Sequence, residues 1–363
     1  MRILGFVDIR SNELIDPLRA ARNGDSATVV ALDPMMSTIA RCQKQFQRGR
    51  QELSSQDIDA IVVYNGTGMI GIIAVLLSSY YSVPVVIRAN GDIYRQHREK
   101  RIEYRQTQRW KLWARYYLHS VLTHITFRYA RGFLAVSEDL ARTLTQQTGC
   151  SRENVRVVHG PVNPAKYCPP NERSVQNSQT ILTVTNLDYR GKYNGVRELV
   201  DTLSVLLSDR EDLQYIIAGD GLYYDLLVRY VERTVPKGVA RRIHTPGYVD
   251  DVAKLYANAD VFAYVSYIDS YPNVILEAQA AGLPVVANPA YGMVEQIEHG
   301  TSGVLVNPSK KGALERTLSH LLEAPEERWR LGDNAAAIVE RENNPTTIGR
   351  QMYAAIKEIV RNS

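Results

Sequence analysis

The feature that most constrains this fold is an alternation, along the whole chain, of short apolar runs with longer mixed segments. Fully apolar runs of about four to eight residues are typical of strands that helices cover on both faces, as in parallel sheets. We therefore predict an α/β protein with two Rossmann-like, doubly wound sheets. The predicted strands are Arg2–Val7, Thr28–Leu32, Ala60–Tyr64, Pro84–Arg88, Gly132–Val136, Val155–His159, Thr180–Thr185, Leu213–Ala218, Val261–Val265, Pro284–Ala287 and Gly303–Val306.

The length of 363 residues is enough for about two domains of ~150 residues each. Proline and polar residues concentrate at 164–179, which predicts a linker between a first domain at 1–163 and a second at 180–344. Residues 345–363 are expected to form a final helix that packs back on the first domain. Its apolar positions have amphipathic spacing and are Ile348, Met352, Tyr353, Ile356, Ile359 and Val360.

Several classes of protein are excluded by composition. The three cysteines form no CxxC pair and have no zinc-ligand spacing with histidine, which favours a reducing compartment. The N-terminus lacks the apolar core and cleavage site of a signal peptide. The most apolar stretch, 60–77, is interrupted at 65–68 and is too short to span a bilayer, which takes about 20 residues. We therefore expect a cytoplasmic protein, with this stretch forming a strand, a glycine turn and a buried helix.

The net charge of +4 is unevenly placed, because residues 1–175 carry an excess of nine positive charges. Most of that excess lies in a segment at 88–131 that also contains interleaved aromatic residues. One interpretation is docking on an anionic membrane surface, and the other is a core-packed aromatic stripe beside solvated arginines. No nucleic-acid module accompanies the segment, so a nucleic-acid partner is not expected. The membrane hypothesis involves Arg95, Arg98, Arg101, Arg105, Trp110 and Trp113.

The densest functional signal is a predicted helix start in the second half. A helical pattern at 275–281 follows the strand 261–265 and is stopped by Gly282 and Pro284. The helix start at 270–273 therefore lies at the carboxyl edge of a parallel sheet, where such folds bind ligands and where helix N–H groups favour phosphate. Asp269 and Glu277 flank it, and their carboxylates suit sugar hydroxyl groups. Together these residues predict a sugar-nucleotide site.

This segment resembles the donor-site signature of the retaining family 4 glycosyltransferases, whose GT-B fold has two Rossmann-like domains that face across a cleft. The signature is an acid, seven residues and Glu, followed by a small-residue helix and Gly-x-Pro-Val-Val; here it reads Asp269, seven residues, Glu277 and AQAAGLPVV. The usual first acid is Glu, so Asp269 departs from the pattern. The resemblance implies that Glu277 binds the ribose and Asp269 the transferred sugar. The implied donor-binding residues are Ser270, Tyr271, Pro272, Asn273 and Val274, with Gly219 in IIAGDGL and Tyr248 and Val249 in TPGYVDD.

The expected diphosphate clamp departs further from the family pattern. Relatives place an Arg shortly after the first strand of this domain, then a Lys; the segment TVTNLDYRGKYNGVRELV has Asn186 at the Arg position. Lys192 fits the Lys position, with Gly195 expected to open a helix, and Arg190 is the candidate replacement for the missing Arg. Two cations facing a diphosphate are the expected electrostatics.

The first half resembles the family more weakly. FLAVSEDLARTLTQQTGCSRENVRVVHGPVN is similar to the stretch before the family's linker, and Ser137 is expected to cap a helix there. The family's glycine turn after the first strand is replaced by DIRSN at 8–12. Its His-Gly after the fourth strand is replaced by Asn90-Gly91-Asp92, so the acceptor-side candidates are Asn90 and Asp92.

These features predict a retaining, hexosyltransferase-type glycosyltransferase. It would move a sugar from a nucleotide-diphosphate donor to a saccharide or lipid-linked acceptor in glycan, polysaccharide or glycolipid assembly. No cofactor and no metal are expected, because no acidic cluster of the DxD kind suits a metal ion. The alternatives are a sugar-nucleotide epimerase or hydrolase of the same fold, and a non-catalytic binding subunit, since a fold does not specify one function. The expected location is cytoplasmic, peripheral on the inner membrane face if the basic segment binds lipid.

Overall fold

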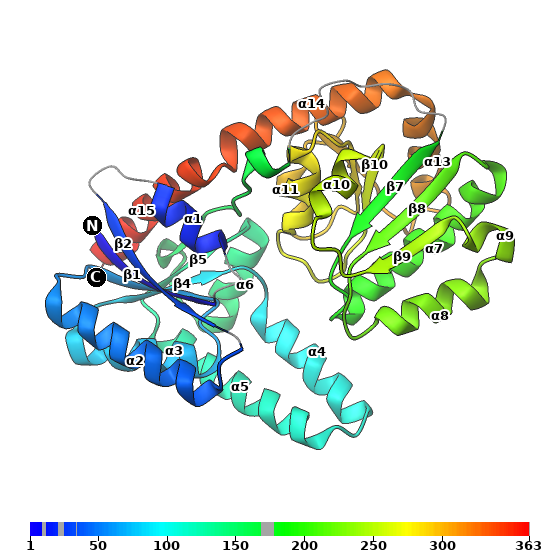
Figure 1. The fold of residues 1–363 in the computed structure, drawn as a ribbon. Coiled ribbons are helices and arrows are strands. Elements are labelled where there is room, and N and C mark those ends of the chain that lie inside the picture. The colour runs from blue at the N-terminus through cyan, green and yellow to red at the C-terminus, as the bar shows by residue number, and fades with distance from the viewer. Residues whose placement is uncertain (9–11, 21–24, 34, 168–177, 363) are drawn as a thin grey trace. The chain divides into compact units, whose positions relative to one another are not determined.

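The computed structural model describes residues 1–362 except 9–11, 21–24, 34 and 168–177 (Figure 1). Most of the predicted linker at 164–179, including Cys168, therefore lies outside the described residues. The chain divides into two compact units. Unit 1 comprises Met1–Pro161 and Asn344–Ser363, and unit 2 comprises Val162–Asn343.

Unit 1 has a six-stranded parallel sheet with the strand order β2-β1-β3-β4-β5-β6. Helices α2, α3 and α5 lie on one face of this sheet, and α1 and α15 lie on the other (Figure 1). The strands are β1 (Arg2–Asp8), β2 (Ser26–Leu32), β3 (Ala60–Tyr64), β4 (Val85–Ala89), β5 (Gly132–Ala135) and β6 (Val155–Val157). The helices are α1 (Asn12–Ala20), α2 (Thr38–Ser55), α3 (Gly68–Tyr81), α4 (Ile93–Gln106), α5 (Trp110–Tyr129), α6 (Glu138–Thr148) and α15 (Pro345–Arg361).

Local signals explain several of these boundaries. The Ser137 hydroxyl accepts a hydrogen bond of 3.2 Å from the Leu140 N–H, which caps α6 as predicted. The predicted final helix is α15, and its apolar face packs in the core of unit 1. There Tyr353 donates a hydrogen bond of 3.2 Å to the Leu18 carbonyl, and Lys357 lies 2.9 Å from an oxygen of Asp25. The last helix is thus packed in the core of unit 1 and has polar contacts with α1 and with the residue before β2.

Unit 2 has a second six-stranded parallel sheet, with the order β12-β11-β10-β7-β8-β9. Its strands are β7 (Gln179–Val184), β8 (Leu213–Ala218), β9 (Ile243–Gly247), β10 (Val261–Tyr264), β11 (Val285–Ala287) and β12 (Gly303–Leu305). Its helices are α7 (Arg190–Asp209), α8 (Tyr224–Thr234), α9 (Lys237–Ala240), α10 (Val252–Ala257), α11 (Asn273–Ala280), α12 (Met293–Gln296), α13 (Ala313–Glu323) and α14 (Pro325–Glu342).

Strand β9 is absent from the sequence-based prediction. Its sequence IHTPG has exposed His244 and Pro246, so it lacks the continuous apolar pattern of the other strands. Because β9 is at the edge of the sheet, a proline there removes no central ladder bond.

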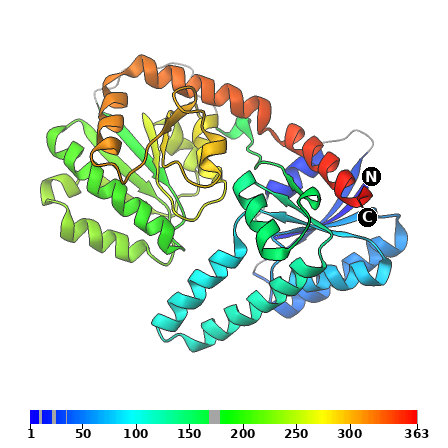
Figure 2. The same ribbon diagram turned by 180° about the vertical axis from the view of Figure 1, so that it is seen from behind.

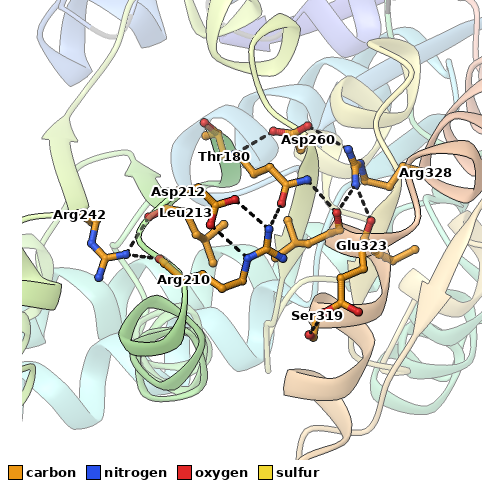
Figure 3. Close-up of polar contacts among 12 residues, drawn as sticks. Thr180, Arg210, Asp212, Leu213, Arg242, Asp260, Ser319, Glu323 and Arg328 are labelled. Atoms are coloured by element: carbon orange, nitrogen blue, oxygen red, sulfur yellow. Dashed lines mark hydrogen bonds and ion pairs between the residues drawn. The ribbon is translucent and has the colours of Figure 1, made fainter. Parts of the chain in front are cut away.

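A polar network joins strand starts in unit 2, at the sheet edge opposite the carboxyl ends (Figure 3). Buried Arg328 donates two hydrogen bonds of 2.7 Å to carbonyls at the end of α13 and lies 3.4 Å from Asp260. Asp260 also accepts a hydrogen bond of 2.8 Å from the Thr180 N–H. Gln179, at the start of β7, donates to an α13 carbonyl and accepts from Arg210. This network ties α13 and α14 to the sheet.

Helices α4 and α5 form a long hairpin beside the sheet of unit 1 (Figure 2). They contain most of the basic, aromatic segment, but Arg88 is not part of its surface. Arg88 is fully buried on β4 and donates hydrogen bonds to the carbonyls of Val158 and His159. Within the described residues, no helix combines the length and apolar character needed to cross a membrane.

Candidate functional site

The predicted helix start is α11, which follows β10 through an eight-residue connection at 265–272. Ser270, Tyr271 and Pro272 are buried, and Asn273 and Val274 are half-buried. Each of the five thus has its backbone in the connection or in the first turn of α11. A hydrogen bond of 3.0 Å from the Gln296 amide to the Pro272 carbonyl, together with one from Asn343 to the Tyr271 hydroxyl, holds this connection in place.

Asp269 lies on the connection between β10 and α11 and is held by three side chains, which come from α7, from β10 and from this connection. Its Oδ1 lies 3.1 Å from Lys192 Nζ, and its Oδ2 accepts hydrogen bonds from the Tyr264 hydroxyl at 2.6 Å and the Ser266 hydroxyl at 2.7 Å. Burial, with the adjacent Asp269 charge, raises the pKa of Tyr264 well above its usual range, so the phenol remains a donor. The structure thus brings together two predicted residues, Asp269 and Lys192. It adds Tyr264 and Ser266, which the sequence reasoning missed.

Lys192 lies in the first turn of α7, because this helix begins at Arg190 and not, as predicted, at Gly195. The role of Gly195 is close approach: a Cβ there would lie 1.8 Å from the carbonyl oxygen of Val265, directly after β10. Any side chain would force α7 away from the end of β10, and Lys192 with it. Arg190 is exposed as the first residue of the same helix, and Asn186 is exposed in the loop before it.

Glu277 lies in α11 and contacts tyrosines from outside that helix. The hydroxyl of fully buried Tyr256, on α10, donates a hydrogen bond of 2.9 Å to Glu277 Oε2. Tyr167 packs edge-on against Tyr256, with ring centroids 5.7 Å apart. Burial raises the pKa of both phenols, and the Glu277 charge raises them further. Both tyrosines therefore stay protonated and can orient the carboxylate, and neither stood out in the sequence because each is separated from the motif.

The remaining predicted donor-site residues follow β8 and β9 at the same carboxyl edge. Gly219 has φ +138°, and a Cβ there would lie 1.7 Å from the carbonyl oxygen of Thr185. Its N–H donates a hydrogen bond of 2.8 Å to the Gly247 carbonyl, which aligns the ends of β8 and β9. Tyr248 follows β9 and is 74% exposed, and Val249 is half-buried. Parallel pairing therefore gathers the second-half candidates along one edge.

The acceptor-side candidates lie after β4 in unit 1. The Asn90 amide donates a hydrogen bond of 2.8 Å to the Tyr64 hydroxyl, and the Asn90 N–H donates one of 3.0 Å to Asn65 Oδ1. Asp92 is the N-cap of α4 and accepts a hydrogen bond of 2.9 Å from the Arg95 N–H. Of the segment DIRSN, residues 9–11 lie outside the described residues.

The six residues of the membrane hypothesis are not equally accessible. Arg98, Arg105 and Trp110 are exposed, whereas Arg95 pairs with Glu99 at 3.5 Å. Arg101 lies over the Tyr117 ring at 5.8 Å, and half-buried Trp113 stacks on that same ring. On α5, exposed apolar residues recur at helical spacing: Leu118, Val121, Ile125 and Tyr129. Trp110, Tyr117 and Val121 of the aromatic stripe are exposed, so the interpretation that packs this stripe in the core is wrong on that point. The exposure of Arg98 and Arg105 agrees with the solvated arginines of the same interpretation.

No group of three or more His, Cys, Asp or Glu side chains in the described part of the chain is arranged to hold a metal ion.

Comparison with known proteins finds glycosyltransferase families for both halves of the chain. Residues 21–166 match the family model described as "Glycosyltransferase Family 4", and residues 178–324 match the model "Glycosyl transferases group 1". The chain is 26% identical to an MMP alpha-(1->4)-mannosyltransferase of Mycolicibacterium hassiacum, over 88% of this chain and 76% of that protein. It is 27% identical to a D-inositol 3-phosphate glycosyltransferase of Corynebacterium kroppenstedtii, over 50% of this chain and 44% of that protein.

The chain spans about half the length of other curated relatives that it matches. It covers 44% of the Corynebacterium kroppenstedtii protein and 49% of a D-inositol 3-phosphate glycosyltransferase of Corynebacterium efficiens. Among solved structures, Anabaena Alr3699/HepE in complex with UDP-glucose superimposes with a TM-score of 0.73. The superposition covers 98% of this chain and 99% of the HepE chain, and the two sequences are 20% identical. This likeness confirms the predicted fold of two Rossmann-like domains.

Proposed function

Because the chain belongs to the group 1, family 4 glycosyltransferases of GT-B fold, we propose that it transfers a hexosyl group from a nucleotide-diphosphate sugar to an acceptor. Anomeric configuration would be retained, and the product would be a glycan, polysaccharide or glycolipid. The observation that carries the proposal is the group formed by Lys192, Asp269 and Glu277 around the start of α11. It places a cation and two oriented carboxylates at the carboxyl edge of a parallel sheet.

The proposed roles follow from charge. Lys192, Arg190 and the N–H groups at the start of α11 bind the diphosphate, because each presents positive charge. Glu277, fixed by Tyr256, accepts hydrogen bonds from the ribose, and Asp269 does so from the transferred sugar. The exposed ring of Tyr248 and the backbone at Val249 contact the base. On donor binding, Lys192 would exchange part of its interaction with Asp269 for a phosphate oxygen.

In the proposed reaction, the acceptor hydroxyl attacks the anomeric carbon from the side on which the diphosphate leaves. The new bond joins the acceptor oxygen to that carbon as its bond to the phosphate oxygen breaks. The acceptor proton passes to the departing diphosphate. Lys192 and Arg190 stabilise the negative charge that develops there, which is electrostatic catalysis and requires no covalent intermediate. We propose that these cations suffice without a metal, so transfer should persist in excess EDTA.

The test measures release of the nucleoside diphosphate. UDP-glucose is the first donor to try, because the HepE structure holds it, followed by GDP- and ADP-sugars in a thermal-shift screen. We expect Lys192→Ala and Glu277→Ala each to lower transfer at least 100-fold with an unchanged circular dichroism spectrum. Lys254→Ala is the matched control, because Lys254 is 80% exposed and pairs with Asp251 across one turn of α10. Full activity in both site variants would refute the site assignment.

The same assay separates the alternatives. With a donor but no acceptor, an epimerase would yield an altered sugar nucleotide and a hydrolase would yield free sugar. A binding subunit would show donor binding or none, but no turnover with any acceptor. The proposal predicts that product formation requires the acceptor.

For location, we propose that the α4–α5 hairpin docks on the anionic inner face of a membrane. Exposed Arg98, Arg105 and Trp110 support this, because each basic side chain near such a surface contributes about 1 kcal/mol. Wild-type protein should sediment with anionic vesicles more than with neutral ones. Charge reversal of Arg98, Arg101 and Arg105 to Glu should abolish the difference, whereas the control reversal of Arg48, Arg50 and Arg142 should not. Equal partition onto both vesicle types would contradict this proposal.

A further inference from the structure

Unit 1 contains a cavity of about 410 Å³ that none of the roles above uses. This volume is within the range of ligand pockets, about 300–1,000 Å³. The cavity lies at the carboxyl ends of β1 and β3, between the first turns of α2 and α3 and the middle of α5. Its lining consists of Phe6, Thr38, Arg41, Cys42, Tyr64, Asn65, Thr67, Met69, Ile70, Arg115, Leu118, His119 and Leu122.

The charge of this lining is one-sided. It includes Arg41 and Arg115 and no carboxylate. Among the described residues, neither arginine forms an ion pair, and the buried Nε of Arg41 has no hydrogen-bond partner. The N-terminal ends of α2 and α3 add their positive dipole ends to the same space. An anion is therefore the complementary ligand.

His119 adds a neutral hydrogen-bonding ring to the polar part of the cavity. Burial lowers the pKa of His119, and the charges of Arg115 and Arg41 lower it further, so its ring is neutral at pH 7. Gly68 makes room for this ring, because a Cβ there would lie 2.4 Å from His119 Cε1. Asn90, the acceptor-side candidate, is not part of the lining, but its amide donates a hydrogen bond to the hydroxyl of Tyr64, which is.

Thr38, Asn65 and Thr67 add neutral polar groups to the lining. Most of the remaining lining residues are apolar, and some of these are open to solvent. Met69 is 40% exposed and Leu118 is 59% exposed. From Leu118, exposed Val121 and Ile125 continue along one face of α5. Such a stripe suits an alkyl chain that extends from a head group in the cavity.

We propose that this cavity binds the phosphate head group of a lipid, with Arg41 and Arg115 on the phosphate and the lipid chain along Leu118 and the α5 stripe. The site would select a lipid phosphate as the acceptor, and in this respect it rests on the proposed function. Docking of the α4–α5 hairpin on a membrane would deliver such a molecule to the cavity, since α5 contributes to both.

The test is calorimetric titration of the full chain with dihexanoyl phosphatidic acid, a short-chain lipid phosphate below its micellar concentration. We expect the double substitution Arg41→Gln/Arg115→Gln to weaken binding at least tenfold. The matched control is Arg50→Gln/Arg128→Gln, which removes one exposed arginine from each of the same two helices and should change the Kd less than twofold. Absence of wild-type binding, or equal effects of the two double variants, would overturn the proposal.

Two further arms identify the source of the anion. Inorganic phosphate should bind at least tenfold more weakly than the lipid phosphate, and Leu118→Ser should weaken only the lipid. If inorganic phosphate binds as tightly, the cavity is a free-phosphate site and the proposal fails. UDP-glucose thermal shift on the same samples reports the donor site in unit 2 separately, so loss of donor binding with intact lipid binding would count against the glycosyltransferase proposal alone.

Discussion

Replacing Tyr256 by Phe tests how much the donor site depends on a residue outside its motif. The substitution removes one oxygen, which donates a 2.9 Å hydrogen bond to Glu277, and keeps a fully buried ring that packs against Tyr167. A hydrogen bond to a charged group contributes about 1.5–3 kcal/mol. The lower end applies, because Tyr167 remains beside the carboxylate. We expect a loss of about 1.5 kcal/mol in the free energy of unfolding.

The same substitution should weaken the sugar-nucleotide donor about tenfold, since 1.4 kcal/mol corresponds to a factor of ten and Glu277 loses its fixed orientation. Urea unfolding gives the first quantity, and calorimetric titration with the donor gives the second. Tyr215→Phe is the control, because this fully buried phenol bonds Thr183 at 2.9 Å and is distant from Glu277 in the chain. A donor Kd within twofold of wild type in Tyr256→Phe, or an equal weakening in Tyr215→Phe, would refute the reasoning.

Two further predictions concern stability. Arg328→Met should lower the free energy of unfolding by about 3 kcal/mol, because it leaves the half-buried carboxylate of Asp260 without its cation and two α13 carbonyls without their donor. Urea unfolding measures this, and donor affinity should not change, since the network lies at the opposite sheet edge. Burial raises the pKa of Asp25, but hydrogen bonds and charge from the N-terminal ammonium and Lys357 outweigh it and lower that pKa below 3.8. A carboxyl group with a lowered pKa stabilises the fold at a pH above its unfolded pKa, and this stabilisation is lost as the pH falls through its folded pKa. Lys357→Met should therefore lower the free energy of unfolding by up to about 1 kcal/mol at pH 7. The loss should become progressively smaller below pH 4. A pH-independent cost would contradict the second prediction.

Continuous apolar runs predicted most of the strands in both sheets, because a strand buried on both faces has little choice of residue type. Helix α11 was equally predictable, since Gly282 and Pro284 stop it and the strand at 261–265 precedes it. Strand β9 was not predictable by this criterion, because an edge strand tolerates polar residues and proline. The start of α7 was misplaced because Gly195 looked like a helix opening when it is required for close packing.

The sequence by itself determined the fold class, the site motif and the uneven charge, since each depends on residue type and local spacing. Only the tertiary structure decided which side chains meet. Lys192 and Asp269 are distant in the chain, and they come within 3.1 Å because β7 and β10 pair as neighbours and Gly195 lets α7 approach the end of β10. Packing of separate elements likewise brings Tyr256 on α10 to Glu277 on α11, and Arg41 on α2 to the same cavity as Arg115 on α5. Contacts between separate elements follow from strand order and close packing, and neither is encoded in local spacing.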